Sequence, residues 1–166
     1  LHLNNNNIKR LDPGIFEGLS NLHCLYLQNN QIAFVPRGLF SDLLSVRYLT
    51  LQRNRLSVLG SGTFLGMISL QTLNLANNKI SRISASAFNH LENLSYLFLE
   101  GNNLTLVPSN AIGRLKNLER LSFLAFNNIT ELQPEVLKPL VSLTHLQMNY
   151  NPWNCSCKML GLLNWL

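Results

Sequence analysis

The side chains that could carry hydrolytic chemistry are few and badly spaced in this sequence. A hydrolytic triad needs a nucleophile, a histidine and a carboxylate that orients the histidine. The only aspartates are Asp12 and Asp42, and the repeats described below place both on the side opposite to His2, His23 and His145. We therefore expect no enzyme. A metal site at His2 and His23 is the alternative to two solvated side chains, but no third ligand is evident.

The three cysteines offer a second kind of chemistry. Cys155 and Cys157 form a CxC pair near the end of the sequence, and Cys24 stands alone. A CxC pair can supply two metal ligands or two disulfide partners, and without a second pair nearby the metal reading is weak. We expect Cys24 to be an unpaired thiol, and a redox site is the alternative.

Composition limits the remaining classes of function. The chain has 166 residues, of which 46% are hydrophobic and 13% charged, enough to bury a core. The net charge of +5 is spread without a block of like charges, so nucleic-acid binding is not indicated. No apolar run reaches 18 residues. The sequence opens and ends inside motifs, so we expect a fragment.

A period of 24 residues organises these side chains. Segments of the form LxxLxLxxNxL begin at Leu22, Val46, Leu70, Leu94 and Leu118, which is the leucine-rich repeat signature. We predict an α/β solenoid: a horseshoe of about seven repeats with a short-stranded parallel sheet on its concave face. The repeats should span residues 1–151.

One asparagine recurs in every repeat. Because a side-chain amide both donates and accepts, stacked amides can satisfy buried backbone groups along the array. The run NNNN at positions 4–7 then contains one such residue, flanked by solvent-facing neighbours. The predicted ladder consists of Asn6, Asn30, Asn54, Asn78, Asn102, Asn127 and Asn151.

A second column lies ten residues after each ladder asparagine. We predict that it forms a buried spine, and an aromatic ligand box is the less favoured reading. Segments such as DPGIF and VPRGLF should be loops or short helical turns on the convex side. The spine consists of Phe16, Phe40, Phe64, Phe88, Ile112 and Leu137.

The outward residues of the short strands should line the concave face. Aromatic and arginine side chains gather there, as in protein-binding hot spots. The alternative is that tyrosine merely favours strands and that Tyr96 and Phe98 pack on each other. The candidate ligand-binding residues are Tyr26, Tyr48, Tyr96, Phe98, Arg47, Arg53 and Arg120.

The repeat changes length once. In LERLSFLAFNNITEL the ladder asparagine comes one residue late, at Asn127, and the next segment starts at Leu143. A bulge is the simplest account. The alternative is a junction near Phe123 to Phe126 at which internal repeats are missing.

The end of the sequence, NPWNCSCKMLGLLNWL, resembles the first half of the cysteine-rich C-terminal cap of extracellular leucine-rich-repeat proteins. The resemblance implies that residues 152–166 begin a cap in which Cys155 and Cys157 pair with two later cysteines that this sequence lacks. It also implies that Pro152 and Trp153 open the cap and that three apolar residues cover the last coil. These three are Leu160, Leu163 and Trp165. A disulfide framework implies an oxidising compartment.

Other stretches, among them LQRNRLSVLGSGTF and VLKPL, resemble single-pass membrane members of the same family. Glycosylation motifs agree with an extracellular location. We expect glycans at Asn93, Asn103 and Asn128, whereas the motif at Asn154 adjoins Cys155 and is less favoured.

The function we expect is extracellular recognition of a protein ligand or co-receptor by a receptor-like protein, without a cofactor. The alternative is a secreted matrix or glycan-binding scaffold, which fits the positive charge but not its dispersal. Leucines exposed at an uncapped first repeat would favour association.

Overall fold

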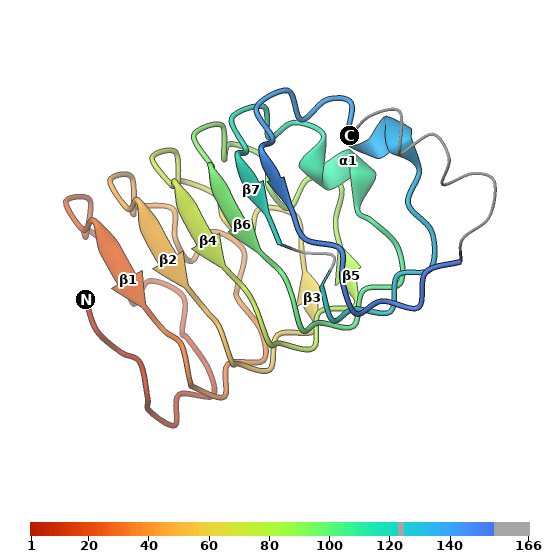
Figure 1. Cartoon of the computed structure of the whole chain (residues 1–166). Coiled ribbons are helices and arrows are strands. Elements are labelled where there is room, and N and C mark those ends of the chain that lie inside the picture. The colour runs from red at the N-terminus through yellow and green to blue at the C-terminus, as the bar shows by residue number, and fades with distance from the viewer. Residues whose placement is uncertain (123–124, 155–166) are drawn as a thin grey trace.

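The chain folds into a stack of short coils whose strands lie side by side in a common sheet (Figure 1). This computed structural model describes residues 1–122 and 125–154. Within them, the larger sheet is parallel, with strand order β1-β2-β4-β6-β7-β8. Its strands are β1 (Cys24–Tyr26), β2 (Tyr48–Thr50), β4 (Thr72–Asn74), β6 (Tyr96–Phe98), β7 (Arg120–Leu121) and β8 (His145–Leu146).

The register of this sheet follows the repeat. Tyr48 pairs with Thr72, Thr72 with Tyr96, and Tyr96 with Arg120. His2 adds a bridge to Tyr26 at the N-terminal edge. Equivalent positions therefore form straight rows across the concave face, as the 24-residue period predicts.

The other side of the coils holds little regular structure. A two-stranded parallel sheet joins β3 (Val58–Leu59) to β5 (Arg82–Ile83). The described helices are α1 (Ser109–Ile112) and the 3-10 turn η1 (Pro134–Val136). The helical part of the expected α/β solenoid is thus small, because glycines with positive φ, such as Gly38 and Gly66, turn the chain after a few residues.

The predicted spine is confirmed as the core. Phe40 and Phe64 are fully buried, and Phe16 and Phe88 are 2% and 1% exposed. Neighbouring rings stack at centroid distances of 5.9, 6.3 and 6.0 Å along the series. Ile112 and Leu137 continue the column, both at 0% exposure. The spine fills the space between coils and leaves no room for an aromatic ligand box.

The ladder asparagines bind backbone groups of neighbouring coils. Asn54 Oδ1 accepts a hydrogen bond from Ile32 N at 2.9 Å, and its Nδ2 donates to Leu27 O at 2.9 Å and Leu51 O at 3.0 Å. Asn30, Asn78, Asn102 and Asn127 repeat this pattern and are buried. The terminal rungs Asn6 and Asn151 are more open and make fewer bonds across coils.

The residue before each rung adopts a left-handed backbone conformation. Its φ lies between 52° and 67° at every described rung. This gives Asn5 a role, because asparagine tolerates that conformation well, and Asn5 Oδ1 also accepts from Asn29 Nδ2 at 2.7 Å. Asn5 faces solvent as predicted, and it also shapes the turn before Asn6. The column consists of Asn5, Asn29, Arg53, Asn77, Gly101, Phe126 and Tyr150.

The longer repeat keeps its place in the stack. Asn127 Oδ1 accepts from Leu104 N at 2.9 Å, as in a coil of ordinary length. The extra residue is therefore absorbed between Ser122 and Asn127. Phe123 and Leu124 lie outside the described residues, so a bulge and a junction both stay predictions.

Candidate functional site

The N-terminal part of the concave face carries a stack of three rings. His2 and Tyr26 lie face to face with centroids 4.4 Å apart, and Tyr26 and Tyr48 are tilted at 5.3 Å. We call His2, Tyr26 and Tyr48 the aromatic stack. The neighbouring Cys24 thiol, together with burial and Tyr48, raises the pKa of the Tyr26 hydroxyl. Cys24 is a free, half-buried thiol.

Small polar residues separate this stack from the rest of the candidate site. In the row of Tyr26, the next two coils place Thr50, which is 2% exposed, and Asn74, which is half-buried. The two aromatic groups predicted from the sequence are therefore not continuous. The concave face therefore carries the ring stack toward its N-terminal end and a separate hollow toward its C-terminal end.

The C-terminal region is a hollow of about 330 Å³ between β6, β7 and β8. We call it the Arg120 hollow, and five of the residues that line it are Phe98, Arg120, Ser122, His145 and Gln147. Phe98 is half-buried and forms an apolar wall. Phe98 thus lies on the predicted outward face but is only partly exposed.

The polar groups of the hollow have defined roles. Arg120 Nη2 lies 3.3 Å from His145 Nε2, and a guanidinium only donates. Nε2 must therefore accept, and the proton of neutral His145 sits on Nδ1. Nδ1 then donates to Thr144 Oγ1 at 2.9 Å, and the Thr144 hydroxyl donates to Glu119 O at 3.0 Å. This chain of hydrogen bonds holds the imidazole and the guanidinium in place.

The acidic side chains of this region already accept hydrogen bonds. Glu119 Oε2 accepts from the Tyr96 hydroxyl at 3.3 Å, and Glu100 Oε2 accepts from Ser122 Oγ. In the part of the chain that the structure describes, the salt bridges join Arg10 to Asp12 and Lys138 to Glu135. The Arg120 guanidinium thus has no carboxylate partner there and can bind one on a ligand.

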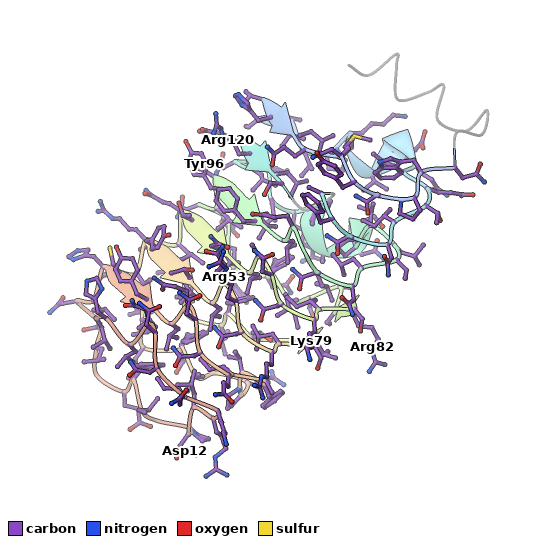
Figure 2. All side chains as sticks on the ribbon, turned by 60° about the horizontal axis from the view of Figure 1, so that its bottom comes forward. Asp12, Arg53, Lys79, Arg82, Tyr96 and Arg120 are labelled. Carbon is purple, nitrogen blue, oxygen red and sulfur yellow. The ribbon has the colours of Figure 1, made fainter. Side chains whose placement is uncertain are left out.

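The structure brings together some of the predicted binding residues and separates others. Phe98 and Arg120 line the hollow. Tyr96 does not line it but pairs in register with Arg120, and Figure 2 shows these two residues side by side. No ring contact joins Tyr96 and Phe98 among the described residues. Arg53 lies apart, at the left-handed turn after β2.

Arg47 is exposed just before β2, and its backbone N–H donates to His23 O at 2.8 Å. The ring of His2 and the side chains of Ser122, His145 and Gln147 were placed on the face by their columns but were not selected. Their signal was their position opposite aromatic or arginine residues of the adjacent coil.

In residues 1–122 and 125–154, no group of three histidine, cysteine or acidic side chains could hold a metal ion. His2 stacks on Tyr26 instead of pairing with His23. None of the helices in this range has the length and apolar character needed to cross a membrane.

The residues of the expected cysteine-rich C-terminal cap lie partly outside those that the structure describes. Cys155, Cys157, Leu160, Leu163 and Trp165 are among the residues that are not described. Trp153 is described: its Nε1 donates to Met148 O at 2.6 Å, and its ring packs on the core.

The three expected glycosylation sites are all exposed. Asn103 and Asn128 occupy equivalent positions in adjacent coils, where Asn128 N donates to Leu104 O at 2.8 Å. Asn93 differs, because its Nδ2 donates to Ile68 O at 2.8 Å. A glycan on Asn93 would have to share that nitrogen with a hydrogen bond between coils.

Comparisons with known proteins agree with this architecture. An internalin from Listeria monocytogenes superposes with a TM-score of 0.65 and 28% sequence identity, covering 81% of this chain and 36% of the internalin chain. Human leucine-rich repeat-containing protein 70 is 67% identical over 43 residues, which are 26% of this chain and 7% of that protein.

Two further relatives share short segments. Mouse reticulon-4 receptor-like 1 is 47% identical over 38 residues, 23% of this chain and 8% of that protein. The rat platelet glycoprotein Ib beta chain is 42% identical over 43 residues, 26% of this chain and 21% of that protein. The aligned segments thus cover a small part of each relative.

The family assignment rests on the repeats themselves. The model of the leucine rich repeat family matches residues 1–56, 45–104 and 99–152. The matches overlap and together follow the stack of coils from its first strand to the last. The chain belongs to the leucine rich repeat family.

Proposed function

We propose that this chain is an extracellular recognition module that binds a protein ligand through its concave face. The observation that carries the proposal is the Arg120 hollow. The hollow places Arg120 beside the apolar wall of Phe98 on a preformed sheet. Among the described residues, Arg120 has no carboxylate partner. Arginine and aromatic side chains in partly desolvated hollows dominate protein–protein binding energy. The aromatic stack supplies a second contact region.

A receptor-like or co-receptor role at the cell surface is the biological setting that we propose. Two relatives are named as a receptor-like protein and as a platelet glycoprotein chain. The stretches quoted above also resemble synleurin, a single-pass leucine-rich-repeat membrane protein. In this setting residues 152–166 begin a disulfide-bonded cap, and membrane attachment and signalling belong to segments beyond this chain. We propose no catalytic role.

The test is binding of a fluorescent tetramer of this chain to intact mammalian cells. Pretreating the cells with trypsin should abolish binding if the ligand is a protein. Arg120→Ala with Tyr96→Ala should weaken binding at least tenfold, because hot-spot truncations cost about 2 kcal/mol or more. Tyr26→Ala with Tyr48→Ala tests the aromatic stack in the same assay.

The matched control changes exposed apolar residues away from the concave sheet. Phe34→Ala with Ile68→Ala removes side chains that are 63% and 51% exposed, and binding should stay unchanged. Unfolding temperatures of all variants are compared first. Binding that survives both concave variants, or that heparinase rather than trypsin removes, would exclude the concave protein site and favour the glycan-binding alternative.

Glycosylation gives a separate test of the extracellular assignment. When the chain is secreted from mammalian cells, Asn103→Gln and Asn128→Gln should each lower its mass by one glycan. Both side chains are exposed beside buried rungs, so a glycan there projects into solvent. Mass spectrometry before and after glycosidase treatment measures the loss.

A second substitution separates the glycan from the asparagine itself. Thr105→Val destroys the motif at Asn103 without touching the asparagine, and it should remove the same mass. A secreted chain whose mass does not change on glycosidase treatment would contradict the prediction.

A further inference from the structure

The small sheet on the convex side ends at β5 for an identifiable reason. Between β3 and β5, Ser84 N donates to Leu59 O at 2.9 Å and Ser81 N donates to Ser57 O at 3.0 Å. One coil later the residue equivalent to Ser84 is Pro108, which has no N–H to donate to Ile83 O. The outer edge of β5 therefore lacks its next strand.

The backbone hydrogen bonds show where the two coils separate. Asn103 N donates to Ile80 O at 2.9 Å, just before β5. Among the described backbone hydrogen bonds, none joins residues 81–85 to residues 104–111 beyond that point. An unpaired strand edge is a template for pairing with another extended chain.

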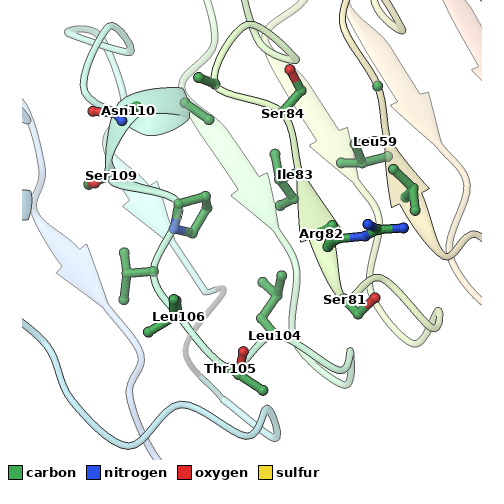
Figure 3. Close-up of a pocket in the computed structure, with 16 residues that line it drawn as sticks. Leu59, Ser81, Arg82, Ile83, Ser84, Leu104, Thr105, Leu106, Ser109 and Asn110 are labelled. Carbon is green, nitrogen blue, oxygen red and sulfur yellow. The ribbon is translucent and has the colours of Figure 1, made fainter.

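A groove lies along this edge. It has a volume of about 730 Å³ and is bounded by β5 on one side and residues 104–111 on the other. Figure 3 shows Arg82, Ile83 and Ser84 on one side of this space and Leu104, Thr105 and Leu106 on the other. We call this space the convex groove. Its volume is in the range that binds a ligand or a short peptide.

The side chains around the groove alternate in character, as a strand requires. On the inner side, Leu59 is buried and Ile83 and Val107 are half-buried against the core. On the outer side, Val58 pairs with Arg82 in register, and Leu106 is 71% exposed across the groove. A strand placed beside β5 would direct one row of side chains at Ile83 and Val107 and the other row between Arg82 and Leu106.

The charge around the groove is positive. No acidic residue occurs between Asp42 and Glu92, and Arg82 is exposed without an ion pair among the described side chains. Lys79 lies on the same side of the molecule as Arg82 (Figure 2). A carboxylate on the outer row of an added strand would be stabilised there.

We propose that the convex groove binds an extended segment of a partner protein, which adds a third strand to the sheet of β3 and β5. Main-chain hydrogen bonds to the β5 edge supply affinity, and alternation supplies specificity. Apolar side chains of the segment face Ile83 and Val107, and acidic side chains face Arg82. This surface is separate from the concave site.

The probe is a fluorescein-labelled octapeptide in which valine alternates with glutamate and threonine. Fluorescence anisotropy with the 166-residue chain measures its dissociation constant. Arg82→Glu should weaken binding at least tenfold. Pro108→Ser should do the same, because it restores the N–H that Ser84 provides one coil earlier and lets residues 104–108 close onto β5.

Matched controls keep the test specific. Pro36→Ser changes the equivalent proline of an earlier coil, outside the groove, and should leave binding unchanged. A peptide with N-methylated backbone amides should fail to bind. Hydrogen exchange at residues 81–85 should slow when the peptide binds. Arg120→Ala should have no effect, so failure here and failure of the concave proposal are separate results.

Several outcomes would overturn the proposal. These are an absence of saturable binding to the wild-type chain, and equal binding by wild type and Pro108→Ser. Displacement of the peptide by heparin oligosaccharides would assign the basic surface to glycans. Self-association that Pro108→Ser abolishes would assign the groove to a second copy of the chain.

Discussion

Replacing Phe64 with alanine is expected to lower the free energy of unfolding by about 4 kcal/mol. Phe64 is fully buried, and its ring stacks between Phe40 and Phe88 at 6.3 and 6.0 Å. In a solenoid each coil contacts only its neighbours. The substitution therefore weakens two coil interfaces at once and leaves a cavity that no distant element can fill. Urea denaturation followed by circular dichroism measures the change.

An exposed phenylalanine provides the control. Phe34 is 63% exposed, so Phe34→Ala should change the free energy of unfolding by less than about 0.5 kcal/mol. Binding of the Phe64→Ala tetramer to cells should fall as its folded fraction falls. The Phe34→Ala tetramer should bind as the wild type does. Equal destabilisation by the two substitutions would contradict the assignment of the phenylalanine column as the core.

The second large effect is expected at the ladder. Asn78→Ala should cost about 3 kcal/mol, because it leaves buried backbone groups without partners at about 1 to 3 kcal/mol each. Asn78 Oδ1 accepts from Leu56 N at 3.1 Å, and its Nδ2 donates to Leu51 O and Leu75 O, both at 3.0 Å. No other side chain can replace these bonds, since the surrounding leucines are apolar.

The first rung offers a control within the same column. Asn6 is exposed, and its Nδ2 donates to Leu3 O and Asn4 O within its own turn. Asn6→Ala should therefore cost less than about 1 kcal/mol in the same denaturation experiment, because water can reach the freed carbonyl groups. A loss at Asn6 as large as that at Asn78 would show that the amide acts through its own turn and not by joining coils.

The concave and convex sites differ in how far the sequence could predict them. Tyr96 and Arg120 could be placed on one face because strand residues alternate and the period is constant. The hydrogen bond of Arg120 with His145 could not be predicted, because it depends on the directions of two long side chains in adjacent coils. The convex groove could not be predicted, because Pro108 looks like an ordinary loop residue in the sequence. Only the structure shows that its position needs an N–H to donate to Ile83 O.

The sequence by itself determined the solenoid, the rows of its concave face, the phenylalanine core and the rungs of the ladder. These features repeat every 24 residues and depend on contacts between equivalent positions, so spacing alone specifies them. Only the tertiary structure decided that Asn5 shapes a turn, that Phe98 is half covered, and that β5 keeps an open edge beside Pro108. Each of these depends on how one coil sits against the next, where backbone direction and side-chain rotamer act over distances that a repeat pattern does not record.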